Sequence, residues 1–251
     1  MMPALGVRPD RFNECVLVDE GPAAARLQRR RRVRSTQAAA LRERREAVRV
    51  APSCRIGVRY SEQPPRAGVS KTRLAEDLGR AEARRIAHFT TARTVRAASG
   101  LGWRVQLHIE PPSAVGDTLG GLWPLAFEHV PQVRGDLGDR LAAAMTRAPY
   151  GPVIFVGTDT PGLSRRHLRQ AERHLRRTGA VFGPAADGGF WLFGLSQSLR
   201  APDVFAGVRW SGPHAMEDVW SNLPDHAHVS LLPQLIDIDT GKDWKLFNYQ
   251  S

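Results

Sequence analysis

The chain has 251 residues and a formal net charge of +11, and hydrophobic residues make up 42% of it. This length suits one α/β domain with or without an appendage, and the apolar fraction suffices for a sizeable core. No run of 18 apolar residues is present, and Cys15 and Cys54 fit no metal spacing and no disulfide framework. We therefore expect a cytoplasmic protein without a membrane span.

Residues 1–52 form a basic segment rich in arginine and alanine. Residues 1–50 hold twelve arginines and six acidic residues, a net charge of +6, so a fifth of the chain carries over half of the excess charge. Little apolar area is available there to offset chain entropy, which favours a disordered or partly helical extension. The alternatives are a non-enzymatic nucleic-acid-binding arm and a start codon assigned too far upstream. We expect a domain boundary after residue 52.

Strand and helix patterns alternate from residue 55 onward. Apolar alternation and continuous apolar runs predict strands over residues 55–60, 105–109, 153–156, 181–183, 190–195 and 231–238. Helices are expected over residues 71–99, 137–148, 164–177 and 213–223. Ser164 is the expected N-cap of the third helix. This order predicts an α/β fold with a mostly parallel sheet between helices on both faces.

The first candidate site follows the first strand. Ligands of such sheets bind outside the carboxyl ends of the strands. The segment over 65–74 reads Pro-Arg-Ala-Gly-Val-Ser-Lys-Thr-Arg-Leu and places Gly68 just before a helix start, where free N–H groups attract phosphate. Cations at a helix start are favourable when an anion is bound. We expect Arg66, Gly68, Lys71 and Arg73 to bind phosphate, and an ordinary basic helix start is the alternative.

Two acidic segments are candidates for a metal site. Asp159 follows the buried strand over 153–156, where it is well placed to hold a divalent cation against a diphosphate. A turn or capping aspartate is an equal alternative. In a strand, Asp237 and Asp239 would point to the same face, so one of them could reach the same cation. The alternative there is a strand end in which Asp239 or Thr240 caps the last helix.

Two further loops are candidates for an acceptor or donor pocket. Asp187, Gly188 and Gly189 allow a ligand to approach the backbone closely, although Asp-Gly is also a common hairpin turn. Asp136 lies at a loop-to-helix junction that contains two acids and two arginines over 134–140. A capping and ion-pair cluster is the alternative to an acceptor site at this junction.

These segments together resemble a known family. The chain carries, in this order, Pro-x-x-Gly-x-x-Lys-Thr-Arg-Leu, Gly-Asp-Leu-Gly-x-Arg, Gly-Thr-Asp-x-Pro, Gly-Pro-Ala-x-Asp-Gly-Gly and Asp-Ile-Asp-Thr. The set resembles the bacterial GT-A-type glycosyltransferases, a family formerly treated as a domain of unknown function. Some members are labelled arsenosugar biosynthesis glycosyltransferases, and molybdenum-cofactor and 2-phospholactate nucleotidyltransferases are distant relatives. The resemblance covers about residues 53–245 and excludes the basic segment.

The resemblance implies a fold, a cofactor and a set of site residues. The fold would be a Rossmann-like GT-A three-layer sandwich over 53–251, with Mg²⁺ or Mn²⁺ held by Asp159 and by Asp239 as a second ligand. Lys71 and Arg73 would contact the donor phosphates. The expected catalytic residues are Lys71, Arg73 and Asp187. The pocket loops would contribute Asp136, Gly188, Gly189, Phe190 and Trp210.

The implied activity is metal-dependent transfer from an activated nucleotide. A glycosyltransferase acting from a nucleotide sugar on a small-molecule acceptor is the first expectation. The alternative is a nucleotidyltransferase, in which a phosphorylated small molecule attacks a nucleoside triphosphate and pyrophosphate leaves. Phe190 stands where the family usually has Tyr, Gly212 where Thr is usual, and Arg93 where Asp is usual.

Overall fold

A computed structural model describes residues 55–59 and 71–250, and for residues 55–59 and 250 it describes the backbone only. The expected boundary after residue 52 and the basic extension before it lie outside the described residues. None of the described helices is long and apolar enough to cross a membrane.

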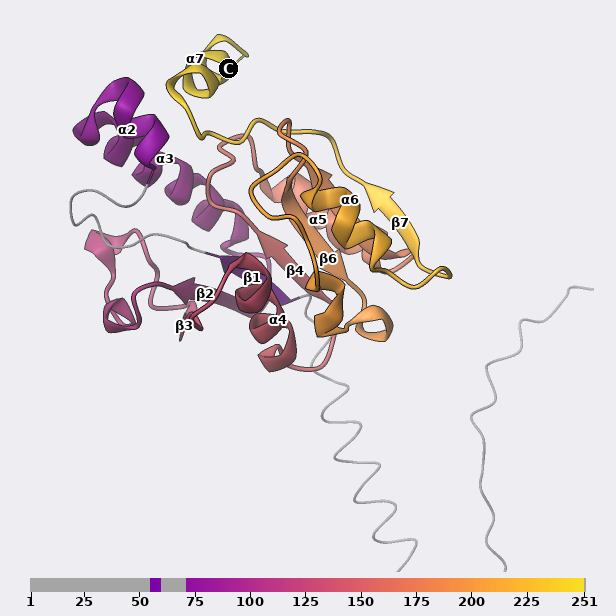
Figure 1. Ribbon diagram of the computed structural model, residues 1–251. Helices are drawn as coiled ribbons and strands as arrows, with labels where there is room; N and C mark the ends of the chain where they lie inside the picture. The colour runs from indigo at the N-terminus through magenta and orange to yellow at the C-terminus, as the bar shows by residue number, and fades with distance from the viewer. Residues whose placement is uncertain (1–54, 60–70, 251) are drawn as a thin grey trace, which may run out of the picture. The chain divides into compact units, whose positions relative to one another are not determined.

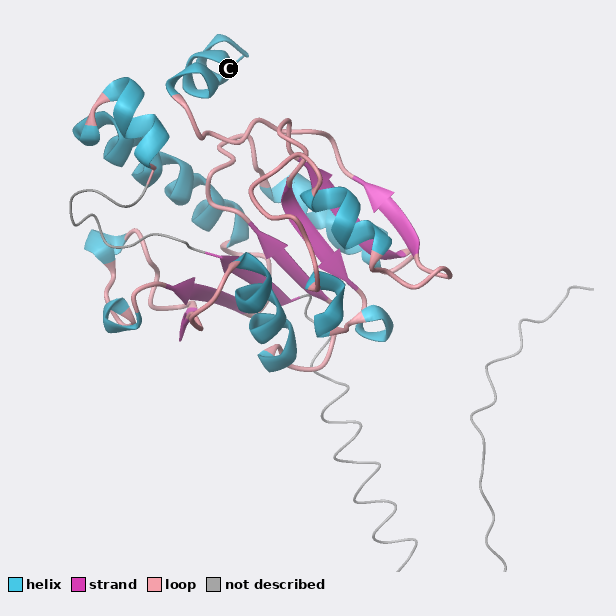
Figure 2. Ribbon diagram, viewed as in Figure 1, coloured by secondary structure: helices cyan, strands magenta, loops and turns pink. Residues whose placement is uncertain are grey.

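Seven strands form one sheet at the centre of this part of the chain (Figures 1 and 2). They are β1 (Arg55–Arg59), β2 (Val105–Ile109), β3 (Glu128–Pro131), β4 (Val153–Val156), β5 (Gly179–Pro184), β6 (Phe190–Leu195) and β7 (His228–Leu231). Their order is β3-β2-β1-β4-β6-β5-β7, and only the pairs that involve β6 are antiparallel. The expectation of a mostly parallel sheet is confirmed.

Helices connect most of the strands. The α-helices are α2 (Thr72–Leu78), α3 (Arg80–Ala98), α4 (Leu137–Arg147), α5 (Arg165–Leu175), α6 (Ala215–Ser221) and α7 (Gly241–Gln250). Short 3-10 helices are η1 (Pro112–Ala114), η2 (Leu119–Gly121), η3 (Gln197–Leu199) and η4 (Pro202–Phe205).

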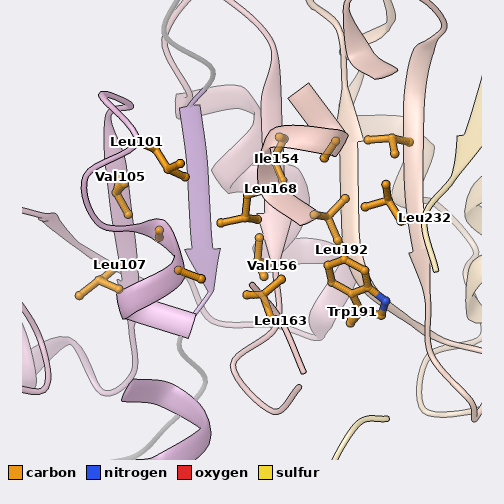
Figure 3. Packing of buried hydrophobic residues seen from close by; sticks show 14 of the residues in the cluster. Leu101, Val105, Leu107, Ile154, Val156, Leu163, Leu168, Trp191, Leu192 and Leu232 are labelled. Carbon is orange, nitrogen blue, oxygen red and sulfur yellow. The ribbon is translucent and has the colours of Figure 1, made fainter. Parts of the chain in front are cut away.

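Strand β4 shows how the sheet is covered on both faces. Ile154 and Val156 pack in one core with residues of α3 and α5 (Figure 3), whereas Val153 and Phe155 pack in a second core with α4, η4 and α6. Full burial of one such side chain contributes about 1.5–3 kcal/mol. Burial on both faces explains the continuous apolar sequence of β4, and it confirms the three-layer α/β fold.

The single helix expected over 71–99 is wrong, because the structure divides it at Gly79. This residue has φ 83° and ψ 156°, a conformation outside the helical region that glycine adopts without a steric penalty. The N–H of Gly79 still donates to the carbonyl of Ala75 at 2.9 Å, so Gly79 ends α2, and α3 begins at Arg80. The two helices can therefore point in different directions.

The strand expected over 231–238 is also wrong in position, since β7 ends at Leu231. Pro233 has no N–H to donate to a ladder. Beyond it, the N–H of Leu235 donates to the carbonyl of Pro184 at 3.2 Å, and that of Ile238 donates to the carbonyl of Asp159 at 3.0 Å. The segment after β7 thus runs across the ends of β5 and β4 instead of extending along the sheet.

Two smaller differences concern β3 and α5. Strand β3 was not expected from the sequence, because Glu128–Pro131 is short and ends in proline at the edge of the sheet, where proline is tolerated. Ser164 is the N-cap residue of α5, as expected, but its side chain makes no capping hydrogen bond. Its hydroxyl lies 3.3 Å from Nδ1 of His167 instead.

Candidate metal and nucleotide site

Asp159 lies in the loop that follows the buried strand β4. The N–H of Gly157 still bonds to the carbonyl of Trp191 at 3.0 Å, so the chain leaves the sheet just before Asp159. Thr158 and Thr160 on either side are buried, with exposures of 6% and 0%. The carboxylate is therefore presented at the carboxyl end of β4 on a fixed backbone.

Asp237 and Asp239 meet Asp159 through the segment that follows β7. The hydroxyl of Thr160 donates to Oδ1 of Asp237 at 2.9 Å, and the Ile238 N–H bond to Asp159 ties the two segments together. One carboxylate oxygen from each of the three aspartates lies within 4.8 Å of the other two. The expected pairing of Asp159 with Asp239 is thus present, although the strand expected to present Asp239 is absent. We call these three residues the aspartate cluster.

Asp237 was expected as one of two alternatives to reach Asp159, and Asp239 was preferred. The structure places both in the cluster. The preference rested on assigning both residues to one face of a strand, whereas they lie in an irregular segment. The sequence contained a signal for this irregular segment, because Pro233 precedes the Asp-x-Asp motif and a proline interrupts the hydrogen bonding between strands.

Burial and the Asp159 carboxylate raise the pKa of Asp237 to about 7, although Lys71 and the Thr160 hydroxyl act in the opposite direction. In the metal-free protein, the Asp237 carboxyl therefore gains or loses its proton near neutral pH.

This pKa makes the stability of the metal-free protein depend on pH. The folded value of about 7 lies above the ordinary value of 3.8, so the folded state binds this proton more tightly. The free energy of unfolding should therefore fall as the pH rises from about 4 to about 7. Replacing Asp237 by asparagine removes this loss, and at pH 8 the variant should be more stable than the wild type, by on the order of a few kcal/mol.

Thermal unfolding with a chelator at pH 4.5 and pH 8 measures the effect of Asp237→Asn. The variant should gain much more stability over the wild type at pH 8 than at pH 4.5. Asp225→Asn is the matched control, because Asp225 is exposed in a loop. An equal difference between Asp237→Asn and the wild type at both pH values would contradict the assignment.

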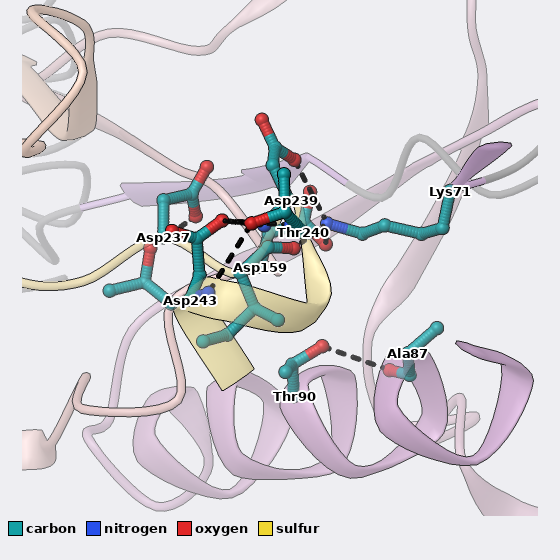
Figure 4. Close-up of polar contacts among 10 residues, drawn as sticks. Lys71, Ala87, Thr90, Asp159, Asp237, Asp239, Thr240 and Asp243 are labelled. Atoms are coloured by element: carbon teal, nitrogen blue, oxygen red, sulfur yellow. Dashed lines mark hydrogen bonds and ion pairs between the residues drawn. The ribbon is translucent and has the colours of Figure 1, made fainter. Parts of the chain in front are cut away.

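Lys71 reaches from the start of α2 into the aspartate cluster (Figure 4). Its Nζ donates to the carbonyl of Ile238 at 2.5 Å and lies 3.0 Å from Oδ1 of Asp159 and 3.3 Å from Oδ1 of Asp239. Only 10% of the side chain is exposed. Burial alone would lower the pKa of Lys71, but the carboxylates of Asp159, Asp237 and Asp239 raise it above its usual value. Lys71 therefore carries a positive charge at neutral pH and lies within the cluster.

The backbone of Lys71 has an uncommon conformation. It has φ 59° and ψ 45°, in the left-handed region that a residue other than glycine adopts uncommonly. Lys71 is also the N-cap of α2, and its carbonyl accepts from the N–H of Ala75 at 2.8 Å. The ion pairs of the side chain and the start of α2 hold this conformation together.

The start of α7 fixes Asp239 from the other side. Oδ2 of Asp243 accepts from the N–H of Thr240 at 2.8 Å and from that of Asp239 at 3.2 Å, and the Thr240 hydroxyl accepts from the N–H of Asp243 at 3.3 Å. Oδ2 of Asp77 accepts from the N–H of Gly241 at 2.7 Å. Thr240 therefore caps the last helix, which was one alternative from the sequence, while the Asp239 side chain faces Lys71.

The aspartate cluster has the donor set that Mg²⁺ or Mn²⁺ prefers. Carboxylate oxygens are hard ligands, and such ions usually bind one or two carboxylates together with waters and substrate phosphates. The side chain of Asp239 is 47% exposed, so the cluster opens to solvent on that side. The residues present therefore fit a divalent cation, and Lys71 shares their oxygens.

The other expected phosphate ligands are only partly described. Arg73 is exposed in the first turn of α2, two residues from Lys71. Arg66 and Gly68 lie outside the described residues. The start of α2 thus carries Lys71, which contacts the aspartate cluster, and Arg73, which is exposed.

The expected pocket residues form a second group around the loop 185–189. Oδ1 of Asp187 accepts from the N–H of Gly189 at 2.9 Å. Gly188 has φ 87°, and a Cβ added there would lie 2.2 Å from the carbonyl oxygen of Pro213. The carbonyl of Gly188 also accepts from the N–H of Met216 at 3.2 Å. The loop is therefore packed tightly against the segment that leads into α6.

Phe190 and Trp210 connect this loop to the start of α4. Their rings lie 6.4 Å apart at 68°, and a Cβ added to Gly138 would lie 2.8 Å from Nε1 of Trp210. Oδ1 of Asp136 accepts from the N–H of Asp139 at 2.9 Å, and Oδ2 of Asp139 accepts from the N–H of Asp136 at 3.0 Å. Asp136 thus has the capping role that was the alternative to acceptor binding.

The chain matches the model of a bacterial family described as "Uncharacterized protein conserved in bacteria (DUF2064)" over residues 91–212. The resemblance to this family is confirmed. The DUF2064 match includes Asp136, Asp159 and Asp187, and it ends before Asp237 and Asp239. A search of curated proteins found no match.

Solved structures share the fold of this chain. A candidate nucleotide-diphospho-sugar transferase from Desulfovibrio desulfuricans G20 is 25% identical with a TM-score of 0.68, over 78% of this chain and 86% of that one. Rv0371c from Mycobacterium tuberculosis H37Rv is 16% identical with a TM-score of 0.50, over 78% and 98%. A 4-diphosphocytidyl-2C-methyl-D-erythritol synthase from Anaerococcus prevotii DSM 20548 is 10% identical with a TM-score of 0.53, over 80% and 97%. The expected fold class is confirmed.

Proposed function

We propose that this chain is a metal-dependent transferase that uses an activated nucleotide, and specifically a glycosyltransferase that acts from a nucleotide sugar on a small-molecule acceptor. The observation that carries the proposal is the aspartate cluster of Asp159, Asp237 and Asp239 at the carboxyl end of β4, beside Lys71 at the start of α2. Carboxylates that can hold a divalent cation next to a cationic helix start suit a diphosphate ligand.

The fold supports the transferase class. The solved structure from Desulfovibrio desulfuricans bears the name of a nucleotide-diphospho-sugar transferase and aligns with 78% of this chain. In such sheets a ligand lies outside the carboxyl ends of the strands, which is where the aspartate cluster and the loop 185–189 lie. We place the transferase domain at residues 53–251 and the enzyme in the cytoplasm.

In the proposed mechanism, Asp159 and Asp239 hold Mg²⁺ or Mn²⁺, which when bound would neutralise charge developing on the leaving phosphate. Lys71 and Arg73 bind the donor phosphates from the start of α2, together with Arg66 and Gly68, and stabilise the same charge. The loop of Asp187, Gly188 and Gly189 orients the reacting groups. Phe190 and Trp210 shape the acceptor side, next to the helix start that Asp136 caps.

Nucleotidyl transfer is the second candidate. It is favoured by the two cationic side chains, Lys71 and Arg73, at one helix start, because a triphosphate carries more negative charge than a nucleotide sugar. In this reaction the acceptor phosphate attacks the α-phosphorus of a nucleoside triphosphate, and pyrophosphate leaves. The carboxylates and cations would have the same roles in both reactions.

One assay separates the two reactions. The protein is incubated with Mg²⁺ or Mn²⁺, a panel of nucleotide sugars and nucleoside triphosphates, and a cell extract that supplies acceptors. We expect a nucleoside diphosphate to be released from a nucleotide sugar. Release of pyrophosphate from a triphosphate would instead establish nucleotidyl transfer. A protein that binds no nucleotide but binds nucleic acid with steep salt dependence would favour the role of the basic segment over residues 1–52.

A further inference from the structure

The position of Lys71 has a consequence for metal binding, which rests on the proposed function of the aspartate cluster. The ammonium group lies between Asp159 and Asp239, at 3.0 and 3.3 Å from their Oδ1 atoms. These are two of the three residues whose oxygens lie within 4.8 Å of one another. An ammonium and a divalent cation that share these oxygens would repel each other at short range in a partly buried setting.

A hydrogen bond to a backbone carbonyl, in addition to the ion pairs, holds the Lys71 ammonium at this position. Its Nζ also donates to the carbonyl of Ile238, and this carbonyl belongs to the residue between Asp237 and Asp239. The side chain is 10% exposed, so the ammonium group has exchanged most of its hydration for protein oxygens. The aspartate cluster therefore already holds a positive charge, which is the ammonium group of Lys71.

A lysine side chain has a flexible four-carbon stem, so its ammonium group can change partners by rotation about the bonds of the stem. Lys71 is the residue just before the first turn of α2. Arg73, two residues further along the chain, is exposed. The donor phosphates of the proposed reaction would offer the Lys71 ammonium oxygens in place of those of the carboxylates.

We propose that Lys71 is an internal cation that occupies the metal centre until a divalent cation and the donor phosphates bind together. The metal takes over the oxygens of Asp159 and Asp239, and the Lys71 ammonium moves to the phosphates. Metal alone then binds weakly, because it must displace a paired charge. Metal and phosphate bind cooperatively, and by linkage each raises the affinity for the other by the same factor.

Mn²⁺ binding to Lys71→Met tests the proposal without any turnover. Free Mn²⁺ is measured by electron paramagnetic resonance in titrations of the full chain, first with Mn²⁺ alone and then with inorganic pyrophosphate as the phosphate probe. Without pyrophosphate, Lys71→Met should bind Mn²⁺ at least about tenfold more tightly than the wild type, which corresponds to about 1.4 kcal/mol. With pyrophosphate, the gain in Mn²⁺ affinity should be large in the wild type and small in the variant.

Control variants make the result specific. Lys245→Met changes an exposed lysine of α7 and should leave Mn²⁺ affinity at the wild-type value. Lys71→Gln keeps a polar side chain at the same place, and it should also bind Mn²⁺ more tightly, so it replaces Lys71→Met if that variant does not fold. Equal or weaker Mn²⁺ binding by the folded Lys71 variant overturns the proposal.

The proposed metal centre can fail independently of this inference. If Asp159→Asn loses Mn²⁺ binding while the Lys71 variants bind like the wild type, the metal centre stands and the role of Lys71 as its internal cation is wrong. If Asp159→Asn binds Mn²⁺ like the wild type, the metal centre itself is wrong, and the inference about Lys71 is overturned with it.

Discussion

Replacing Asp159 by alanine should abolish metal-dependent nucleotide binding and lower turnover by about 100-fold or more, as expected when a main source of charge stabilisation is lost. Asp159 is the one member of the aspartate cluster that β4 presents directly, and its carboxylate lies 3.0 Å from Lys71. Without it, the remaining carboxylates lie on the single segment after β7. Calorimetry with Mg²⁺ and a nucleoside diphosphate measures the binding.

The control for this substitution is Asp225→Ala. Asp225 is exposed in the loop before β7, so its removal should change neither binding nor turnover. Asp159→Ala should remain folded, since Lys71 keeps Asp239 and the Ile238 carbonyl as partners. Undiminished metal-dependent nucleotide binding in a folded Asp159→Ala protein would refute its role as a ligand.

Replacing Gly188 by alanine should destabilise the protein by about 3 kcal/mol or more, a loss seen when steric conflict meets a backbone that has no room to relax. The new Cβ would lie 2.2 Å from the carbonyl oxygen and 2.5 Å from the Cα of Pro213, and φ is 87°. One of the two loops would have to move. Turnover should fall as well, because Asp187 and Gly189 belong to the displaced loop.

Gly207→Ala separates the two causes of this loss. Gly207 has a similar positive φ of 66°, but an added Cβ would meet no atom within 4 Å. It should therefore show only the cost of the left-handed backbone, about 1–2 kcal/mol. Thermal unfolding compares the variants, with about 2–4 °C expected for each kcal/mol in a chain of this length. Equal losses for Gly188→Ala and Gly207→Ala would show that the contact with Pro213 has no effect.

The sequence predicted correctly those helices and strands that a single local pattern determines. The apolar run of β4 requires burial on both faces, and the structure provides it. The single helix expected over 71–99 was wrong because apolar residues continue at helical spacing past Gly79, whereas the backbone of Gly79 is not helical. Strand β3 gave no signal of its own, since an edge strand of four residues has too few positions to show alternation.

The candidate site was predictable in its residue types and less so in its contacts. Asp159 could be placed because it directly follows a strand that the sequence identifies. Asp239 was preferred to Asp237, and the sequence could not show that both reach Asp159, because their positions depend on how the segment after Pro233 crosses the ends of the strands. The pairing of Lys71 with Asp239 joins residues 168 apart in sequence, and no local pattern reports such a contact.

The hydrogen bond from the N–H of Ile238 to the carbonyl of Asp159 joins the segment after β7 to the loop after β4. The aspartate cluster can therefore be complete only once this late segment of the chain is in place. The seven strands of the described residues all lie before residue 232, whereas two of the three clustered carboxylates lie after it. A nascent or proteolytically shortened chain that ends there would keep every strand of its sheet and lose most of its cation ligands. Local opening of the C-terminal segment could likewise switch off the site while the sheet remains intact.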